Sequence, residues 1–213
     1  MVVRVCERAR ASGARSVTVA TDDARIRAAV EAAGFRALMT RRSHASGTDR
    51  IAEAAARLRL KGADVVVNVQ GDEPLIAPRL IARVAAALRR RRAASMSTAC
   101  HPIEDRASLE NPNVVRVVLD ANGYALYFSR ARIPFPREPK GVWYRHAGIY
   151  AFRVGFLKKF SGMKQSPDEK TESLEQLRAL WHGHRVAVVV SRAAIPPGVD
   201  TPRDLRAVRR MLR

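Results

Sequence analysis

Two aspartates, Asp72 and Asp200, stand where metal-assisted phosphate chemistry would need them. Each lies in a loop between an expected strand and an expected helix, and Gly71 and Pro74 end the valine-rich strand at 65–69 beside Asp72. Open α/β sheets bind ligands beyond the carboxyl ends of their strands. Two carboxylates there could hold Mg²⁺, which takes hard oxygen ligands and keeps substrate phosphates in its shell. Each aspartate alone is equally typical of a turn acid near a helix N-terminus, so only the pair favours a metal site.

Small residues begin the helix that follows the polar loop at 40–48, namely Ser46, Gly47 and Thr48. Their hydroxyls and free backbone N–H groups would suit a nucleotide base or a phosphate. Ser and Thr before a helix are more often N-caps, however, and taken alone these residues favour a cap.

A third group combines cations with side chains that bind hydroxyls. Arg130 or Arg145 could bind a carboxylate through two parallel hydrogen bonds. Taken separately, each member of the group is typical of a surface or structural residue. The remaining histidines lack metal-ligand spacing, and no Ser or Cys nucleophile motif is present. The side chains that could bind sugar hydroxyls are His146, Tyr150, Glu175 and Gln176.

Alternating strands and amphipathic helices predict the scaffold that positions these residues. Single helices separate the strands up to residue 100, which indicates βαβ crossovers and a doubly wound, mostly parallel sheet of the α/β class. A hairpin-type turn at 120–123 then predicts an antiparallel insertion at roughly 111–153, within one domain that spans 1–213. Ser166 and Glu169 predict a capped helix that runs to about Trp181, and Thr201 caps a terminal helix. Strands are expected at 16–20, 35–39, 65–69, 94–100, 114–119, 124–129, 145–153 and 185–190.

The charge of this 213-residue chain is its strongest bulk anomaly, with 39 basic against 20 acidic residues and a net charge of +19. Such a charge attracts nucleic acid and other anions. The basic residues are mostly scattered arginines without interleaved aromatics, which favours a solvated surface over a specific nucleic-acid partner. No apolar run reaches the ~18 residues of a membrane span, and no signal peptide is evident. Cys6 and Cys100 form no spaced pair, as expected of reduced core residues in a cytoplasmic protein.

Taken in order, these segments resemble the 3-deoxy-manno-octulosonate (Kdo) cytidylyltransferases, or CMP-Kdo synthetases. The similarity covers essentially the whole chain. Related acylneuraminate cytidylyltransferases share the acid loop but not the RHAGIY and LEQLR strings. The matching strings are ATDD at 20–23, EAAG at 31–34, MTRRSHASGTDRIAE at 39–53, VNVQGDEP at 67–74, NPNVVRVVLDANGYALYFSRARIP at 111–134, RHAGIYAFR at 145–153, LEQLRALWHG at 174–183 and GVDTPRDL at 198–205.

The resemblance implies a mixed sheet of the nucleotide-diphospho-sugar transferase type and a homodimer formed through the antiparallel insertion. It implies a Mg²⁺-dependent cytoplasmic enzyme of lipopolysaccharide synthesis. In that reaction the anomeric hydroxyl of Kdo attacks the α-phosphorus of CTP, and CMP-Kdo and pyrophosphate result. A metal clamp and positioned cations would then supply most of the catalysis. By this similarity Asp72 and Asp200 hold Mg²⁺. The residues that would lie against the cytidine are Ser46, Gly47 and Thr48. The sugar-acid pocket would contain Gln70, Arg130, His146, Tyr150, Glu175 and Gln176.

Members of this family begin with a buried strand and a loop of the form PARxxSxRLPGKxL, whose cations neutralise the triphosphate, whereas this chain starts inside the helix at 2–10. We therefore expect a longer form of the enzyme. Without that strand, its neighbours would have unpaired backbone groups and an open apolar slot. The alternatives are a cytidylyltransferase for another 2-keto sugar acid, an inactive truncated relative, and an Arg-rich nucleic-acid-binding protein. The last of these predicts steeply salt-dependent DNA binding and no stabilisation by CTP.

Overall fold

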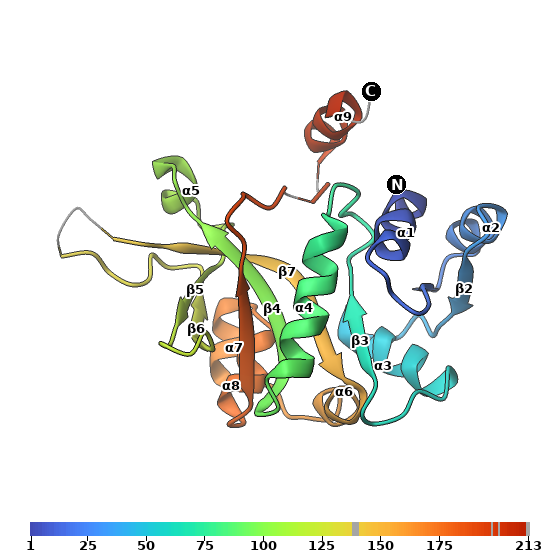
Figure 1. Ribbon diagram of the computed structural model, residues 1–213, viewed down its shortest axis with the longest axis horizontal. Coiled ribbons are helices and arrows are strands. Elements are labelled where there is room, and N and C mark those ends of the chain that lie inside the picture. The colour runs from blue at the N-terminus through green and yellow to red at the C-terminus, as the bar shows by residue number, and fades with distance from the viewer. Residues whose placement is uncertain (138–140, 197, 200, 212–213) are drawn as a thin grey trace.

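The computed structural model describes residues 1–137, 141–196, 198–199 and 201–211. Each strand that the sequence predicts is present, and two further short helices, α5 and α6, are added (Figure 1). The helices are α1 (Val2–Ala11), α2 (Ala24–Ala32), α3 (Gly47–Arg57), α4 (Pro78–Arg90), α5 (Arg106–Glu110), α6 (Val154–Phe160), α7 (Pro167–Glu172), α8 (Gln176–Trp181) and α9 (Pro202–Met211). The strands are β1 (Thr18–Thr21), β2 (Arg36–Met39), β3 (Val65–Asn68), β4 (Ala94–Pro102), β5 (Arg116–Leu119), β6 (Ala125–Ser129), β7 (Tyr144–Arg153) and β8 (Arg185–Val190).

The long strand β7 organises the main sheet. One of its edges pairs along β4, whereas β5 pairs at its first residues and β3 at its last four. All three pairings are antiparallel, and β8 then extends the sheet parallel to β4. The α/β class with a mixed sheet is therefore confirmed, but its ladders are less parallel than expected. The reason is that β7 enters from the β5–β6 hairpin region and not through a helical crossover, so nothing forces it to run parallel to its neighbours.

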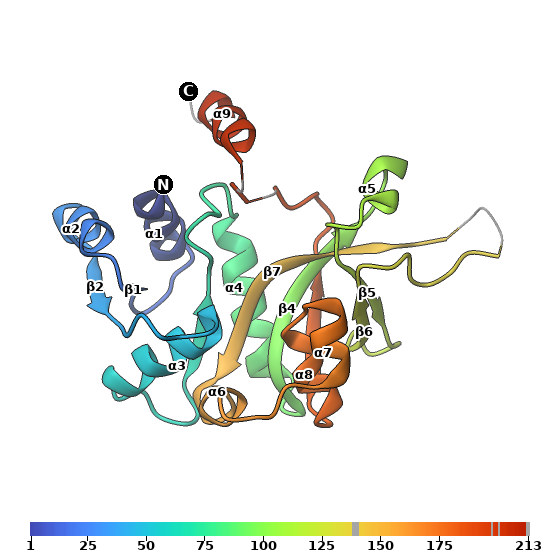
Figure 2. The same cartoon turned by 180° about the vertical axis from the view of Figure 1, so that it is seen from behind.

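A separate parallel pair, β1 and β2, lies beside this sheet (Figures 1 and 2). Among the described residues β3 pairs with β7 alone, and β1 pairs with β2 alone. Helix α3 nevertheless contacts both β1 and β3. Among the described residues, β1 and β3 thus each have one backbone edge without a partner strand, as expected for the two strands on either side of the open apolar slot.

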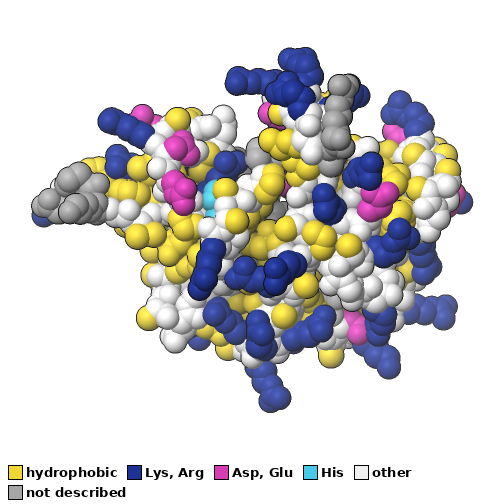
Figure 3. Space-filling view, turned by 45° about the horizontal axis from the view of Figure 1, so that its top comes forward, with side chains coloured by type: hydrophobic (Ala, Val, Ile, Leu, Met, Phe, Trp, Pro, Cys, Tyr) yellow, Lys and Arg dark blue, Asp and Glu magenta, His cyan; other side chains and the backbone are white. Residues whose placement is uncertain are grey.

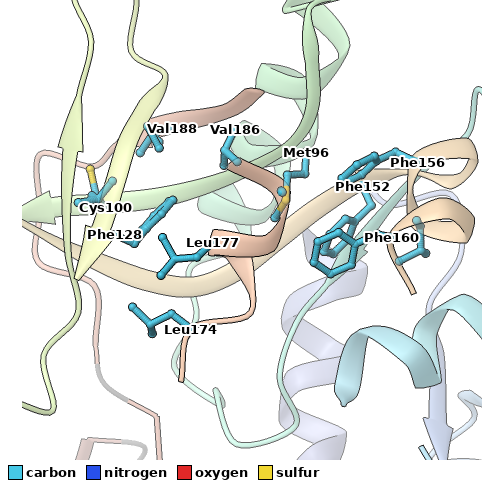
Figure 4. Close-up of a cluster of buried hydrophobic side chains, with 14 of the residues drawn as sticks. Met96, Cys100, Phe128, Phe152, Phe156, Phe160, Leu174, Leu177, Val186 and Val188 are labelled. Carbon is cyan, nitrogen blue, oxygen red and sulfur yellow. The ribbon is translucent and has the colours of Figure 1, made fainter. Parts of the chain in front are cut away.

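Helices cover both faces of the main sheet, because alternate residues of each strand point to opposite faces. Ala151 belongs to the core beneath α4, together with Leu80, Val84 and Leu88. Its neighbour Phe152 belongs to the core under α6 and α8 (Figure 4), which also contains the residues Met96, Phe156, Phe160, Leu174 and Leu177. Cys6 and Cys100 are buried and free, as expected, and burial raises the pKa of the Cys100 thiol to about 12.

One expected helix is wrong. The segment 166–181 is not continuous, since α7 ends at Glu172 and Ser173 has the left-handed backbone angle φ 54°. Its predicted start is confirmed, because the Ser166 hydroxyl accepts from Glu169 N–H and Glu169 reaches back to Ser166 N–H. The break opens the chain just before Glu175 and Gln176, so both can face the sheet edge.

Other local expectations hold. Asp120 N–H donates to the Tyr124 carbonyl in the β5–β6 hairpin, and Thr201 caps α9 by accepting from Asp204 N–H. On the face in Figure 3 the Lys and Arg side chains are spread over many elements and form no single band. Within the described part of the chain, no helix has the length and apolar character needed to cross a membrane.

Candidate active site

The acid loop follows β3, as the sequence predicts. β3 ends at the buried Asn68, and Gly71 and Asp72 form a turn before α4. The Val199 N–H donates to the Asp72 carbonyl over 2.8 Å, so the chain just ahead of residue 200 lies against this loop. Gly198 makes the approach possible, because a Cβ there would lie 3.3 Å from a Glu73 carboxylate oxygen. Asp200 itself lies outside the described residues.

The fit of this loop to Mg²⁺ depends on its donor atoms. The half-buried Asp72 offers a carboxylate, which is the hard oxygen ligand that Mg²⁺ takes, and no histidine or cysteine competes for a softer metal there. Over the described residues, no group of three or more His, Cys, Asp or Glu side chains is arranged to hold a metal. The carboxylate of Asp72 therefore fits Mg²⁺ as one of its oxygen ligands.

The start of α3 touches two other candidate groups. Ser46 is the N-cap and accepts from Asp49 N–H over 3.1 Å, so its cap role holds. A Cβ at Gly47 would lie 3.9 Å from Gln70 Nε2, which places the helix start beside the acid loop. The buried Thr48 donates to Glu175 Oε2 over 2.7 Å, across 127 positions of sequence. The structure thus joins the small residues of α3 to both the acid loop and the α7–α8 break.

His146 and Tyr150 lie together on β7, with ring centroids 5.4 Å apart, and Phe128 packs edge-on against His146 at 5.0 Å. Burial lowers the pKa of His146 to about 3, so its ring is neutral near neutral pH. Burial, and then the charge of Glu175, raise the pKa of Tyr150 above its ordinary value. Both half-buried rings therefore offer neutral hydrogen-bonding groups, as recognition of hydroxyl groups requires.

Glu175 and Gln176 carry an unusual pair of atoms. Glu175 Oε1 and Gln176 Nε2 are buried without a hydrogen-bond partner, and the only other such side-chain atom in the described part is Arg116 Nε. Glu175 Oε1 has a charge contact with Arg178 Nη2 at 3.8 Å, which is too long for a hydrogen bond. An orphaned buried acceptor or donor costs about 1–3 kcal/mol. One acceptor and one donor on adjacent residues, beside Tyr150, are what a ligand with several hydroxyls would satisfy.

Arg130 is held beside this pocket by Glu172, a residue that the sequence alone did not single out. Glu172 Oε2 accepts from Arg130 N–H over 2.9 Å, the Glu172 carbonyl accepts from Arg130 Nε over 3.0 Å, and the Ser129 hydroxyl donates to the same carboxylate. Among the described residues, no hydrogen-bond acceptor engages the terminal guanidinium nitrogens of Arg130, which could therefore bind a carboxylate. No local motif marks Glu172, because its partners are more than 40 positions away.

A second missed residue organises the loop before α3. Glu53 accepts from Arg41 N–H over 3.1 Å and contacts His44 Nε2. The hydrogen bond from His44 and then that from Arg41 lower the pKa of Glu53 to about 2, so the carboxylate stays charged. This anchor fixes the loop that leads into Ser46. The sequence hardly indicates this contact, because Glu53 lies nine residues after His44 and faces it only once α3 has formed.

The chain has a mixed α/β sheet, and its acid loop meets the start of α3 at one edge. This arrangement places the chain among the nucleotide-binding α/β proteins. The family model described as cytidylyltransferase matches residues 1–186, and the chain belongs to that family. It is 54% identical over 228 residues to a 3-deoxy-manno-octulosonate cytidylyltransferase of Acidovorax sp. (strain JS42), covering 100% of this chain and 87% of the relative.

A second relative with the same name, from Leptothrix cholodnii (strain ATCC 51168 / LMG 8142 / SP-6), is 53% identical over 219 residues, with 99% of this chain and 81% of the relative covered. The structure is also similar to a solved CMP:2-keto-3-deoxy-manno-octonic acid synthetase complexed with CTP. That similarity has a TM-score of 0.92 at 41% identity, over 99% of this chain and 86% of the other. A likeness of this extent confirms the family that the sequence strings indicated.

Proposed function

We propose that this chain transfers the cytidylyl group of CTP to 3-deoxy-manno-octulosonate, for lipopolysaccharide synthesis. The anomeric oxygen of the sugar acid forms a bond to the α-phosphorus and loses its proton. The bond from that phosphorus to the bridging oxygen of the β-phosphate breaks, and pyrophosphate leaves. The relatives' names and the CTP complex support this reaction. The observation that carries it here is the contact of Thr48 with Glu175, which joins a helix start suited to a nucleotide to a pocket suited to a polyol.

The roles of the side chains follow from their surroundings. Ser46, Gly47 and Thr48 would lie along the cytidine, where the first turn of α3 offers backbone N–H groups. Gln70, beside Gly47, would lie where nucleotide and sugar acid meet. Arg130 would bind the sugar carboxylate with its free guanidinium nitrogens. The orphaned atoms of Glu175 and Gln176, with His146 and Tyr150, would bind sugar hydroxyls.

Asp72 and Asp200 would hold Mg²⁺, whose charge would stabilise the triphosphate and the departing pyrophosphate. The protein's own contribution is to bring the loop ahead of residue 200 against Asp72, through the Val199 hydrogen bond. Catalysis of phosphoryl transfer consists mostly of positioning and electrostatic stabilisation, so the protein would hold the two anions in line while Mg²⁺ and Arg130 would offset their repulsion.

The test is pyrophosphate release from purified protein with CTP, Kdo and MgCl₂. We expect release with CTP and not UTP, loss with EDTA, and preference for Kdo over its 8-amino analogue and neuraminic acid. The matched variants are Gln176→Leu and, as a control, Glu110→Gln on the exposed side of α5. The assignment would be refuted if pyrophosphate release required neither CTP nor Kdo. It would also be refuted if folded protein released no pyrophosphate at all.

We also propose that the enzyme is a homodimer whose contact includes the arm before β7. Phe135 and Val142 are 81% and 64% exposed, which is costly for large apolar side chains unless a second copy covers them. Trp143 Nε1 donates to the Pro134 carbonyl over 3.0 Å, which joins the described residues on the two sides of this arm. Sedimentation of the wild type should give a dimer, and Phe135→Asp should shift it to monomer; an unchanged mass would exclude this contact.

The buried free thiols Cys6 and Cys100 fit a reducing compartment, and we propose the cytoplasm.

A further inference from the structure

The strand β7 bulges between His146 and Tyr150. In its ladder with β4, Ala99 faces Ala147 but Ser97 faces Ala151, so four steps of β7 match two steps of β4. Bulges beside active sites commonly redirect side chains. In a regular strand, residues four apart are separated by about 13 Å, yet the rings of His146 and Tyr150 have centroids 5.4 Å apart. The bulge therefore gathers two neutral rings at one place in the pocket.

Thr98 lies opposite the bulge and is fully buried, at 0% exposure. Its Oγ1 lies 2.8 Å from the Ile149 carbonyl oxygen, 3.2 Å from the Ala147 carbonyl oxygen and 2.9 Å from His146 Nε2. A hydroxyl has one proton to donate, while both carbonyl oxygens can only accept. If the Thr98 proton pointed to His146, two carbonyl oxygens would face hydroxyl lone pairs at hydrogen-bond distance. The arrangement is satisfied when Thr98 donates to a carbonyl and His146 Nε2–H donates to Thr98.

We infer that Thr98 is a positioning residue that fixes His146 in the tautomer protonated at Nε2. Nδ1 is then an acceptor, and no group in the described residues hydrogen-bonds to it. This inference rests on the proposed function for its ligand. His146 Nδ1 would accept a hydrogen bond from a sugar hydroxyl and could not bind the sugar carboxylate, because the ring is neutral and its one N–H, at Nε2, is directed to Thr98. The sugar carboxylate would then bind Arg130. At His146 Nδ1 the pocket would accept a ligand group that donates a hydrogen bond, such as a hydroxyl, and reject one that can only accept.

The first measurement is the ¹⁵N spectrum of the histidines in the full-length protein without substrate, with His146→Gln to assign the signal. The expected spectrum has a protonated Nε2 and an unprotonated Nδ1 at His146. A proton on Nδ1 in the wild type would overturn the inference, whether or not the enzyme makes CMP-Kdo. His146→Gln serves only to assign the signal, and the tautomer itself is read from the wild type.

The second measurement compares Thr98→Val, which keeps the shape and removes the hydroxyl, with Thr98→Ser, which keeps the hydroxyl. In Thr98→Val we expect the His146 signals to shift toward the other tautomer, and the KM for Kdo to rise about tenfold while the KM for CTP changes little. Thr98→Ser should restore both readouts, which a purely structural loss would not. An unchanged tautomer in folded Thr98→Val would refute the role of Thr98, whereas failure to use Kdo with the expected spectrum would count against the proposed function alone.

Discussion

Replacing Glu169 with alanine should destabilise the protein more than any surface change of the same kind. Glu169 and Arg178 form a buried ion pair with side chains 5% and 8% exposed, and Arg178 donates through Nε and Nη2 to the two carboxylate oxygens. Although burial alone would raise the pKa of Glu169, its hydrogen bond and charge contact with Arg178 lower it, so the pair is ionised. Arg178 also lies over the Phe160 ring at 4.8 Å, which fixes α8 against α6.

The magnitude follows from what Glu169→Ala leaves behind. The guanidinium of Arg178 would remain buried without its hydrogen-bonded carboxylate, with only Glu175 Oε1 left at 3.8 Å, and breaking such a pair costs about 3–5 kcal/mol. The capping box of α7 loses its Glu169 member too, which adds up to about 1 kcal/mol. A domain of this kind has about 5–15 kcal/mol of stability in all, so the change removes a large share of it.

Urea unfolding followed by circular dichroism measures this directly. With a slope of about 2 kcal/mol/M, a total loss of about 3–6 kcal/mol should lower the midpoint by about 1.5–3 M. The matched control is Glu110→Ala, which breaks a helical pair with Arg106 whose side chains are 53% and 87% exposed, and which should cost at most about 0.5 kcal/mol. If the two variants unfold at the same urea concentration, the buried pair does not hold α7 and α8 in place and the reasoning is wrong.

Three further outcomes are expected. Glu172→Gln replaces one acceptor oxygen by a donor, so the Arg130 N–H and the Ser129 hydroxyl no longer both have a carboxylate acceptor, although Arg130 Nε keeps its bond to the Glu172 carbonyl. The loosened Arg130 should raise the KM for Kdo about tenfold with little change for CTP, as steady-state kinetics will test. The folded pKa of His146, about 3, is below the unfolded value of about 6.5, so the unfolded state binds the extra proton between them. Stability should then fall by about 1.4 kcal/mol per pH unit as the pH drops through that window, and urea unfolding of His146→Gln should show a shallower slope. Asp72→Asn should lower kcat about 10²-fold and remove the Mg²⁺-dependent rise in Tm with CTP, whereas an unchanged Tm response would exclude Asp72 as a metal ligand.

Local chemistry made much of the fold predictable. The valine run followed by Gly71 predicted β3 and its acid loop, since a strand with apolar residues on both faces has no polar alternation. Val66 packs against one core cluster and Val65 and Val67 against the other, although all three are only partly buried. The Ser166–Glu169 capping box and the turn at 120–123 act within a few residues, and both formed as expected. The site residues Thr48, His146 and Glu175 came from the family strings, because separately each was typical of a structural residue.

Long-range contacts explain what the sequence did not reveal. The direction of β7 depends on where the hairpin region delivers the chain, and nothing within 144–153 encodes it. The helix break at Ser173 could not be predicted from the sequence, because no Gly or Pro stands there. Ser173 adopts a left-handed conformation that the buried Glu169–Arg178 pair and the α8 contacts must stabilise. Glu172 and Thr98 act through partners more than 40 positions away.

The break between α7 and α8 lies among residues that stabilise the fold and residues that would bind the substrate. Glu172 ends α7 and holds Arg130, while Glu175 begins the next segment and accepts from Thr48 of α3. A continuous helix would turn residues 172 and 175 onto one face, because residues three apart are neighbours there. The left-handed Ser173 separates them, so one short segment can position a cation for the sugar carboxylate and leave a buried acceptor open for a hydroxyl. A substitution that favours a continuous helix at 173, such as Ser173→Ala, should therefore weaken Kdo binding through Arg130 and Glu175 together.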